Sequence, residues 1–227
     1  MFETIKNAFK DKNIRKKMLY TVLMIFIYRI GCFIPVPGIK ADAIGSLIGD
    51  SEFFQLLGIV SGGALSQGTI FALGIIPFIN AFIIMQLLTL IIPRLEKMSK
   101  EGEEGRKKIT QITRYVAIVL AIIQSIGVLM SWKGSIKPAF GDSEASVYCT
   151  MALMGIILVG GSTLVMWIGE RITEYGIGNG TSLIIFIGIL SGGGTALLNS
   201  FGVISNNLNL LWNLFGFILV IIAIFVF

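Results

Sequence analysis

Long apolar runs separated by short polar segments dominate this sequence. Six charge-poor runs recur, at residues 18–34, 70–92, 112–130, 147–168, 181–198 and 210–227. A helix needs roughly 20 apolar residues to cross the hydrocarbon core of a membrane. A soluble helical core would instead need amphipathic stripes, which these runs lack. The pattern therefore predicts six membrane-spanning helices.

A glycine-rich segment precedes the second run. Residues 58–68 are apolar enough to enter a membrane, but they are too short and too rich in glycine to span it. Interrupted backbone at membrane depth is tolerated only where protein buries it or where it lines a cavity. A half-inserted segment that leads into a full span therefore indicates a pore or a substrate path. We expect a protein that moves something across a bilayer.

The second run contains a helix breaker, Pro77. Its ring clashes with the carbonyl four residues earlier, so we expect the helix to bend or to begin anew at residues 73–74. Ile75 and Ile79 are four residues apart and share a helix face. A narrow ring of branched apolar side chains can exclude water and ions by dewetting, but most isoleucines in membrane helices face lipid or neighbouring helices. The spacing alone leaves both roles open.

Several polar side chains lie inside the second and third runs, namely Asn80, Gln86, Thr89, Gln124 and Ser125. In hydrocarbon they should face protein or water, where each interhelical hydrogen bond is worth on the order of 1 kcal/mol. They fit either a fixed helix contact or a moving gate.

Arg29 lies within the first run, where a charge at the bilayer centre would cost about 2.5–3.5 kcal/mol. It is close enough to the end of that run to reach the outer headgroups or the carbonyls of another helix. We expect a structural role for it.

The basic residues predict the orientation of the chain. Six lysines and arginines lie in residues 1–17 and seven in residues 94–114, and Arg171 follows the fourth run. Lys40, Lys133 and Lys137 lie on the opposite side. This imbalance places the N-terminus in the cytoplasm and favours contact with anionic lipid. Because the basic residues flank spans without interleaved aromatic residues, nucleic-acid binding is not expected.

Composition narrows the function further. Apolar residues make up 55% of the chain, charged residues 14%, and the mean hydropathy is +0.86, far outside soluble globular usage. The chain has two cysteines, Cys32 and Cys149, and no histidine, so the usual zinc and haem ligand and the usual catalytic base are missing. We expect no enzyme, cofactor or metal. The glycine-rich residues 176–180 follow a membrane helix, so they predict a tight turn and not a phosphate loop.

The order of the segments suggests a repeat. Residues 1–17 are expected to form an amphipathic cytoplasmic N-terminus, and residues 18–198 form a unit of five spans. A second copy of an odd-numbered unit would have to be inverted in the membrane, a recurrent arrangement in conduits. The run at residues 210–227 ends without a flanking charge, so we expect a fragment whose truncated sixth span opens the second half.

Several separated blocks resemble the SecY family, the channel subunits of the bacterial protein translocase. They occur in the family's order and cover nearly all of the chain. The blocks are Tyr28-Arg29-Ile30-Gly31, Phe33-Ile34-Pro35-Val36-Pro37-Gly38, Ser61-Gly62-Gly63-Ala64-Leu65-Ser66, Ile70-Phe71-Ala72-Leu73-Gly74-Ile75-Ile76-Pro77, Glu101-Gly102 through Gly105-Arg106-Lys107-Lys108-Ile109, Ile112-Thr113-Arg114-Tyr115, Met166-Trp167-Ile168-Gly169-Glu170-Arg171-Ile172-Thr173-Glu174 and Gly176-Ile177-Gly178-Asn179-Gly180.

The resemblance implies an all-α, polytopic membrane helix bundle, the first half of an inverted five-plus-five-helix repeat. It implies that residues 61–71 form the plug, a short re-entrant helix that closes the channel from outside. Three sets of site residues follow from it: the plug residues Ser61, Gly62, Gly63, Ala64, Leu65 and Ser66; the pore ring Ile75, Ile79 and Ile185; and the lateral-gate residues Gln86, Thr89 and Gln124.

The function implied by the resemblance is passage of unfolded secretory polypeptides across the cell membrane, with sideways release of apolar segments into lipid. The implied partners are the SecE and SecG subunits, the SecA motor ATPase, the ribosome, signal peptides with their preproteins, and membrane lipids. One alternative is a secondary transporter with broken helices, which would need strongly polar residues at the break. The other is a structural subunit without a lumen, which would make no contact between Ile75 and any substrate.

Overall fold

The computed structural model describes residues 11–39, 57–136 and 144–204. Within these ranges every long regular element is a helix, and strand-like pairing is confined to two isolated bridges, so the predicted all-α class is confirmed. Two of the predicted features, the sixth span at residues 210–227 and most of the amphipathic N-terminus, lie outside the described residues.

Helices occupy the first five apolar runs. They are α2 (Lys12–Gly31), α5 (Ile76–Ile91), α7 (Glu103–Trp132), α8 (Glu144–Tyr175) and α9 (Gly180–Ile204). Among the described residues, α7 and α8 are long and apolar enough to cross a membrane. A third span exists if α5 and the short α6 (Pro93–Lys100), which meet at 102°, count as one. The first span was predicted at residues 18–34, but α2 begins earlier and ends at Gly31.

Two helices, α2 and α7, extend beyond their apolar runs into polar sequence. α2 begins inside the basic stretch because Asp11 caps it, its carboxylate accepting a hydrogen bond from the Asn13 N–H at 3.0 Å. α7 begins at Glu103, and the two carboxylates in its first turn suit the positive end of the helix dipole. These extensions place charged side chains beyond the apolar length of each helix.

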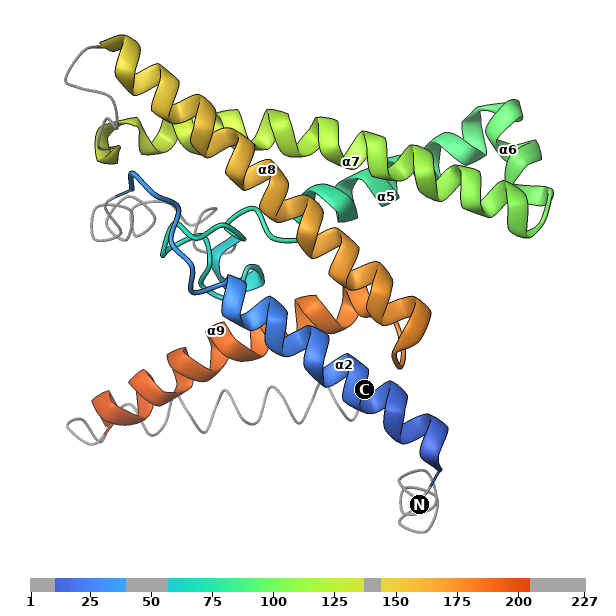
Figure 1. Ribbon diagram of the computed structural model, residues 1–227, viewed down its shortest axis with the longest axis horizontal. Helices are drawn as coiled ribbons and strands as arrows, with labels where there is room; N and C mark the ends of the chain where they lie inside the picture. Colours follow the sequence, from blue (N-terminus) through green and yellow to red (C-terminus); the bar gives the residue numbers. More distant parts are fainter. Residues whose placement is uncertain (1–10, 40–56, 137–143, 205–227) are drawn as a thin grey trace.

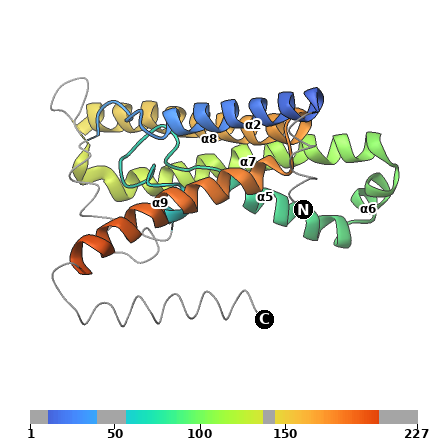
Figure 2. The same ribbon diagram turned by 90° about the horizontal axis from the view of Figure 1, so that it is seen from below.

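The helices alternate in direction across the molecule (Figure 2). The beginnings of α2 and α7 lie at the same end as α6, whereas the end of α7, the beginning of α8 and the end of α9 lie at the opposite end (Figures 1 and 2). α2 and α8 run side by side, and α7 packs against both α5 and α8. The α5–α7 contact is close because Ala81 and Ala117, both buried, leave room for the two backbones.

Many of the outward-facing side chains are apolar. Leu90 is 79% exposed, Leu19 71% and Ile156 69%. Exposure of so many large apolar side chains suits contact with lipid hydrocarbon.

The middle of the bundle holds a segment that is mostly not helical, residues 57–75, which we call the central segment (Figure 1). One side of it contributes Leu65 and Leu73 to a core shared with α7 and α8. The other side contributes Phe71 and Ile75 to a core shared with α2, α8 and α9. Protein thus covers the central segment on both sides. Irregular backbone at membrane depth is tolerated where protein buries it in this way.

The short helix expected over residues 61–71 is not formed. Helix occurs only at residues 57–60, and residues 61–68 form successive turns. Gly62, Gly63 and Gly68 have φ of +66°, +85° and +59°, values that interrupt a right-handed helix. The expected bend in the second run is confirmed. Gly74 has φ +56°, and α5 begins at Ile76 with Pro77 in its first turn, where a missing N–H costs nothing.

Candidate functional site

The three isoleucines of the predicted ring lie in one apolar cluster. Ile75 is a buried member of the core shared by α2, α8 and α9, and Ile79 and Ile185 pack against the same core. Ile75 precedes α5, Ile79 lies one turn into it, and Ile185 comes from α9. Ile79 and Ile185 also line a cavity of about 440 Å³, which we call the polar cavity. The structure therefore brings together residues that lie far apart in the sequence.

The break before α5 is fixed from another helix. The buried Ser162 hydroxyl of α8 donates to the Gly74 carbonyl at 3.1 Å. This carbonyl lies just before the first turn of α5, where an unmade hydrogen bond in a buried place would cost about 1–3 kcal/mol. Nothing local in the sequence indicates the partner of Ser162, which lies 88 positions away.

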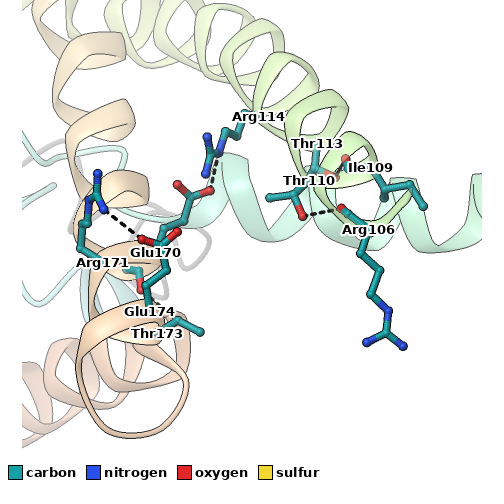
Figure 3. A network of polar contacts seen from close by, with 10 residues as sticks. Arg106, Ile109, Thr110, Thr113, Arg114, Glu170, Arg171, Thr173 and Glu174 are labelled. Atoms are coloured by element: carbon teal, nitrogen blue, oxygen red, sulfur yellow. Dashed lines mark hydrogen bonds and ion pairs between the residues drawn. The ribbon is translucent and has the colours of Figure 1, made fainter. Parts of the chain in front are cut away.

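An ion pair borders the polar cavity. Arg114 of α7 donates from Nε to Glu170 Oε1 of α8 at 2.7 Å, and the Glu170 side chain is only 16% exposed (Figure 3). Thr173, Asn179, Phe78 and Phe82 line the same cavity. Its lining thus combines charged, polar and apolar side chains. Arg114 and Glu170 occur in blocks of the sequence that resemble the SecY family, but no spacing rule pairs them.

The hydroxyl groups of the central segment stabilise its turns. Ser61 Oγ donates to the Gly58 carbonyl at 3.1 Å and accepts from the Leu65 N–H at 3.2 Å. Ser66 Oγ donates to the Gly63 carbonyl at 2.8 Å. Because these bonds are local, they shape the segment without attaching it to the surrounding helices.

Glycines on three helices let those helices approach the central segment. A Cβ on Gly161 of α8 would lie 1.9 Å from the Ile70 carbonyl oxygen, and one on Gly188 of α9 would lie 2.4 Å from the Val60 carbonyl oxygen. At Gly31 of α2 the obstacle would be the Phe71 ring, at 2.0 Å. A side chain at any of these positions would force its neighbour to shift, so the close packing of the central segment depends on these glycines.

Arg29 connects α2 to the central segment. Its Nη1 donates to the Gly62 carbonyl at 3.2 Å, and its guanidinium lies 5.0 Å from the centre of the Phe33 ring. Of the two expected positions for the guanidinium, headgroups or the carbonyls of another helix, the structure shows a carbonyl contact, but the partner is a turn of the central segment and not a helix.

The predicted gate residues do not meet at one place. Gln86 and Thr89 line a cavity of about 490 Å³ beside Arg106 and Thr113. Gln124 lines a separate cavity of about 520 Å³. Both cavities are lined by residues of α5 and α7, so the predicted gate residues lie at two separate places along this helix pair.

Residues 176–180 form the predicted tight turn between α8 and α9. Gly178 has φ +77°, and the Asn179 side chain caps α9 by accepting from the Thr181 N–H at 3.0 Å. Thr21 Oγ1 of α2 accepts from the Ile177 N–H at 3.1 Å, which fastens this turn to the first helix.

Among the described residues, the structure shows neither a cluster of metal ligands nor a disulfide. No group of three or more His, Cys, Asp or Glu side chains there could hold a metal ion. Cys32 is buried and Cys149 exposed, and both are free.

Comparison with known proteins identifies relatives. Residues 69–227 match the SecY family. The chain is 44% identical over 192 residues to the protein translocase subunit SecY of Staphylococcus carnosus, covering 84% of this chain and 44% of that protein. The chain thus spans less than half the length of this relative.

Two solved structures share the fold. One, described as the structure of a protein conducting channel, is 26% identical with a TM-score of 0.56, over 79% of this chain and 37% of that one. The other, a SecY structure whose plug domain is described as stabilising the closed state and maintaining a membrane seal, is 24% identical with a TM-score of 0.53, over 77% and 35%.

Proposed function

The chain belongs to the SecY family, and on this premise we propose that it forms the first half of a channel that passes unfolded polypeptides across a membrane. The observation that carries the proposal is the position of Ile75, Ile79 and Ile185. They lie in one apolar cluster to which the central segment contributes Phe71 and Ile75, and Ile79 and Ile185 also line the polar cavity. A ring of branched apolar side chains suits a conduit that must pass every side chain and still exclude ions when idle.

The central segment supports the role of plug. In the related SecY structure the plug domain is described as maintaining a membrane seal. Here, long-range polar attachments of the segment include the Arg29–Gly62 and Ser162–Gly74 hydrogen bonds and backbone pairing with residues 34–36. Turns between these points can move as a unit once the attachments break. We infer that such displacement opens the path.

The α5–α7 pair supports one wall of a lateral gate. Gln86, Thr89 and Gln124 lie at two separate places along this pair, next to exposed apolar side chains. An apolar segment of a passing chain would gain free energy by leaving along such a wall into lipid, at about 25 cal/mol per Å² of apolar surface removed from water. The opposite wall is expected in the second half of the protein.

We infer a multi-pass position in the cell membrane with the N-terminus in the cytoplasm, because the basic ends of α2, α6 and α7 lie at one end of the bundle. We propose the SecE and SecG subunits, the SecA motor, the ribosome and preproteins as partners, which would supply targeting and energy.

A translocation assay tests the proposal. The full-length protein, assembled with its partner subunits in vesicles, should make an unfolded secretory precursor resistant to added protease, and a precursor with a polar substitute for its signal segment should stay exposed. The same vesicles should not accumulate labelled amino acids or sugars under an ion gradient. Solute accumulation with an unprotected precursor would favour the secondary transporter.

A further inference from the structure

A groove between α7 and α8 is used by none of the functions above. It has a volume of about 540 Å³ and lies where the last turns of α7 meet the first half of α8. This end of the bundle lies opposite the basic beginnings of α2 and α7 (Figures 1 and 2), so in the orientation inferred above it faces the outer leaflet. We call it the outer groove.

The walls of the outer groove are apolar. On α7, Ile122, Ile126 and Met130 recur every four residues, so they share one helix face, and all three are exposed. On α8, the small residues Ala152 and Gly155 leave the space that the groove occupies. A concave site lined in this way favours an apolar ligand.

The buried polar side chain of this lining is already satisfied. Ser125 Oγ of α7 donates to the Ile122 carbonyl of its own helix at 2.8 Å. Gly155 lies opposite, since a Cβ built there would be 3.9 Å from Ser125 Oγ and 3.4 Å from Leu129 Cδ1. The base of the groove therefore offers contacts with hydrocarbon, and Ser125 has no proton left to donate to a ligand.

A cation lies at the mouth of the groove. Lys133 begins the short 3₁₀ helix η1 (Lys133–Ser135) that follows α7. Its Nζ donates to the Tyr148 hydroxyl at 3.2 Å and lies 5.0 Å from the centre of the Tyr148 ring, and Tyr148 itself lines the groove. Lys133 is exposed and forms no ion pair within the described part of the chain, so further donors of its ammonium group remain for an anion. Tyrosine and lysine together are typical of the headgroup level of a membrane.

The depth of the groove matches one leaflet. Along α8 its lining runs from Tyr148 to Val159, a rise of about 16 Å at 1.5 Å per residue. The hydrocarbon core is about 30 Å thick, so the groove reaches about half-way through it. A membrane-spanning helix of another subunit would extend across the whole core, whereas an acyl chain belongs to one leaflet. The depth and the cation at the mouth therefore favour a phospholipid over a helix.

We propose that the outer groove holds one acyl chain of an outer-leaflet phospholipid, whose phosphate contacts Lys133. The chain would lie against Ile126 and Gly155 and would fasten the end of α7 to the beginning of α8. The proposal depends on the membrane position of the protein and not on protein conduction, so the two can fail separately.

Photocrosslinking with a modified lipid tests the site. The full-length protein with its partner subunits is placed in phosphatidylethanolamine–phosphatidylglycerol vesicles that contain a trace of phosphatidylglycerol with a diazirine in the middle of one acyl chain. Illumination follows transfer into detergent, which dilutes away loosely held boundary lipid, and the labelled peptides are mapped by mass spectrometry. We expect label at Ile126 and Gly155. Unmodified phosphatidylglycerol should displace it, whereas glycerophosphoglycerol, the same headgroup without acyl chains, should not.

Filling the groove should remove the label. Ala152→Leu places a branched side chain in the space that the acyl chain would occupy, and should lower the label by about fivefold or more. The matched control is Leu153→Phe, which adds the same number of carbon atoms at an exposed neighbouring position outside the groove and should keep the label. Translocation of a precursor by the Ala152→Leu protein shows that it is folded.

Removing the cation should also weaken the label. Lys133→Gln should lower it by about fivefold, the contribution of one basic residue near a membrane surface, and Lys133→Arg should restore it. Because Lys133 is exposed, the packing of α7 is unaffected.

Label that is unchanged in both Ala152→Leu and Lys133→Gln would overturn the proposal. Displacement by glycerophosphoglycerol would mean that a headgroup alone is recognised, which contradicts the acyl-chain assignment. A photoreactive residue at Ile126 that crosslinks to a partner subunit, and not to lipid, would assign the groove to a protein helix. Absence of label at the groove in the wild-type complex would contradict the proposal as well.

Discussion

Replacing Arg29 by methionine should make the idle channel leak ions. The substitution keeps most of the side-chain volume and removes the donor to the Gly62 carbonyl. A hydrogen bond from a charged group contributes about 1.5–3 kcal/mol, and each 1.4 kcal/mol changes an equilibrium about tenfold. The closed position of the central segment should therefore lose about tenfold or more in population. The measurement is release of an entrapped ion or dye from vesicles containing the full-length protein and its partner subunits.

Arg29→Lys is the matched control for this experiment, because it keeps the charge and one flexible donor while losing the planar guanidinium. Its leak should fall between those of the wild-type protein and Arg29→Met. The methionine variant should still translocate a precursor, which shows that the bundle has folded. A wild-type level of leak in a translocating Arg29→Met protein would mean that Arg29 only anchors α2 at the membrane surface.

Alanine at two adjacent glycines of α8 should have opposite effects on stability. At Gly161 the new Cβ would lie 1.9 Å from the Ile70 carbonyl oxygen, so either α8 or the central segment must move. Overpacking of this kind costs about 1–3 kcal/mol, and here the obstacle is backbone, which cannot change rotamer. At Gly160 no atom of another described segment lies within 4 Å of the new Cβ, and alanine in a helix is favoured over glycine by about 0.5–1 kcal/mol.

Thermal unfolding of the detergent-solubilised protein measures both effects. We expect Gly161→Ala to lower the midpoint temperature and to increase the idle leak, because the displaced Ile70 lies in the central segment. Gly160→Ala should leave the leak unchanged and hold or raise the midpoint. Equal midpoints for the two variants would show that α8 does not approach the central segment as closely as described.

The local features of this fold could be predicted from the sequence. Apolar run length located five helices, and Pro77 predicted a break at residues 73–74, close to Ile76, where α5 begins. The turn at residues 176–180 followed in the same way from its glycines. In each case the interactions that decide the structure lie within a few residues of one another.

The contacts around the central segment could not be predicted from sequence patterns. Gly160 and Gly161 look alike in the sequence, and only the rotation of α8 about its axis decides which of them meets the Ile70 carbonyl. The partners of Arg29 and Ser162 lie 33 and 88 positions away. The prediction of a helix over residues 61–71, which the resemblance implied, was wrong. Three glycines within residues 61–68 take positive φ, which interrupts a right-handed helix.

The central claim is that Ile75, Ile79 and Ile185 lie on the path of a passing polypeptide. The most direct measurement is site-specific crosslinking in the full-length protein, with a photoreactive residue at each position and a stalled secretory chain in the channel.

Ile156, which is 69% exposed on α8, is the lipid-facing control. Ile75 is only 3% exposed, so its adduct would also require the central segment to move. The account predicts adducts at all three isoleucines and none at Ile156. Silence at all three, with targeting of the stalled chain intact, would contradict it.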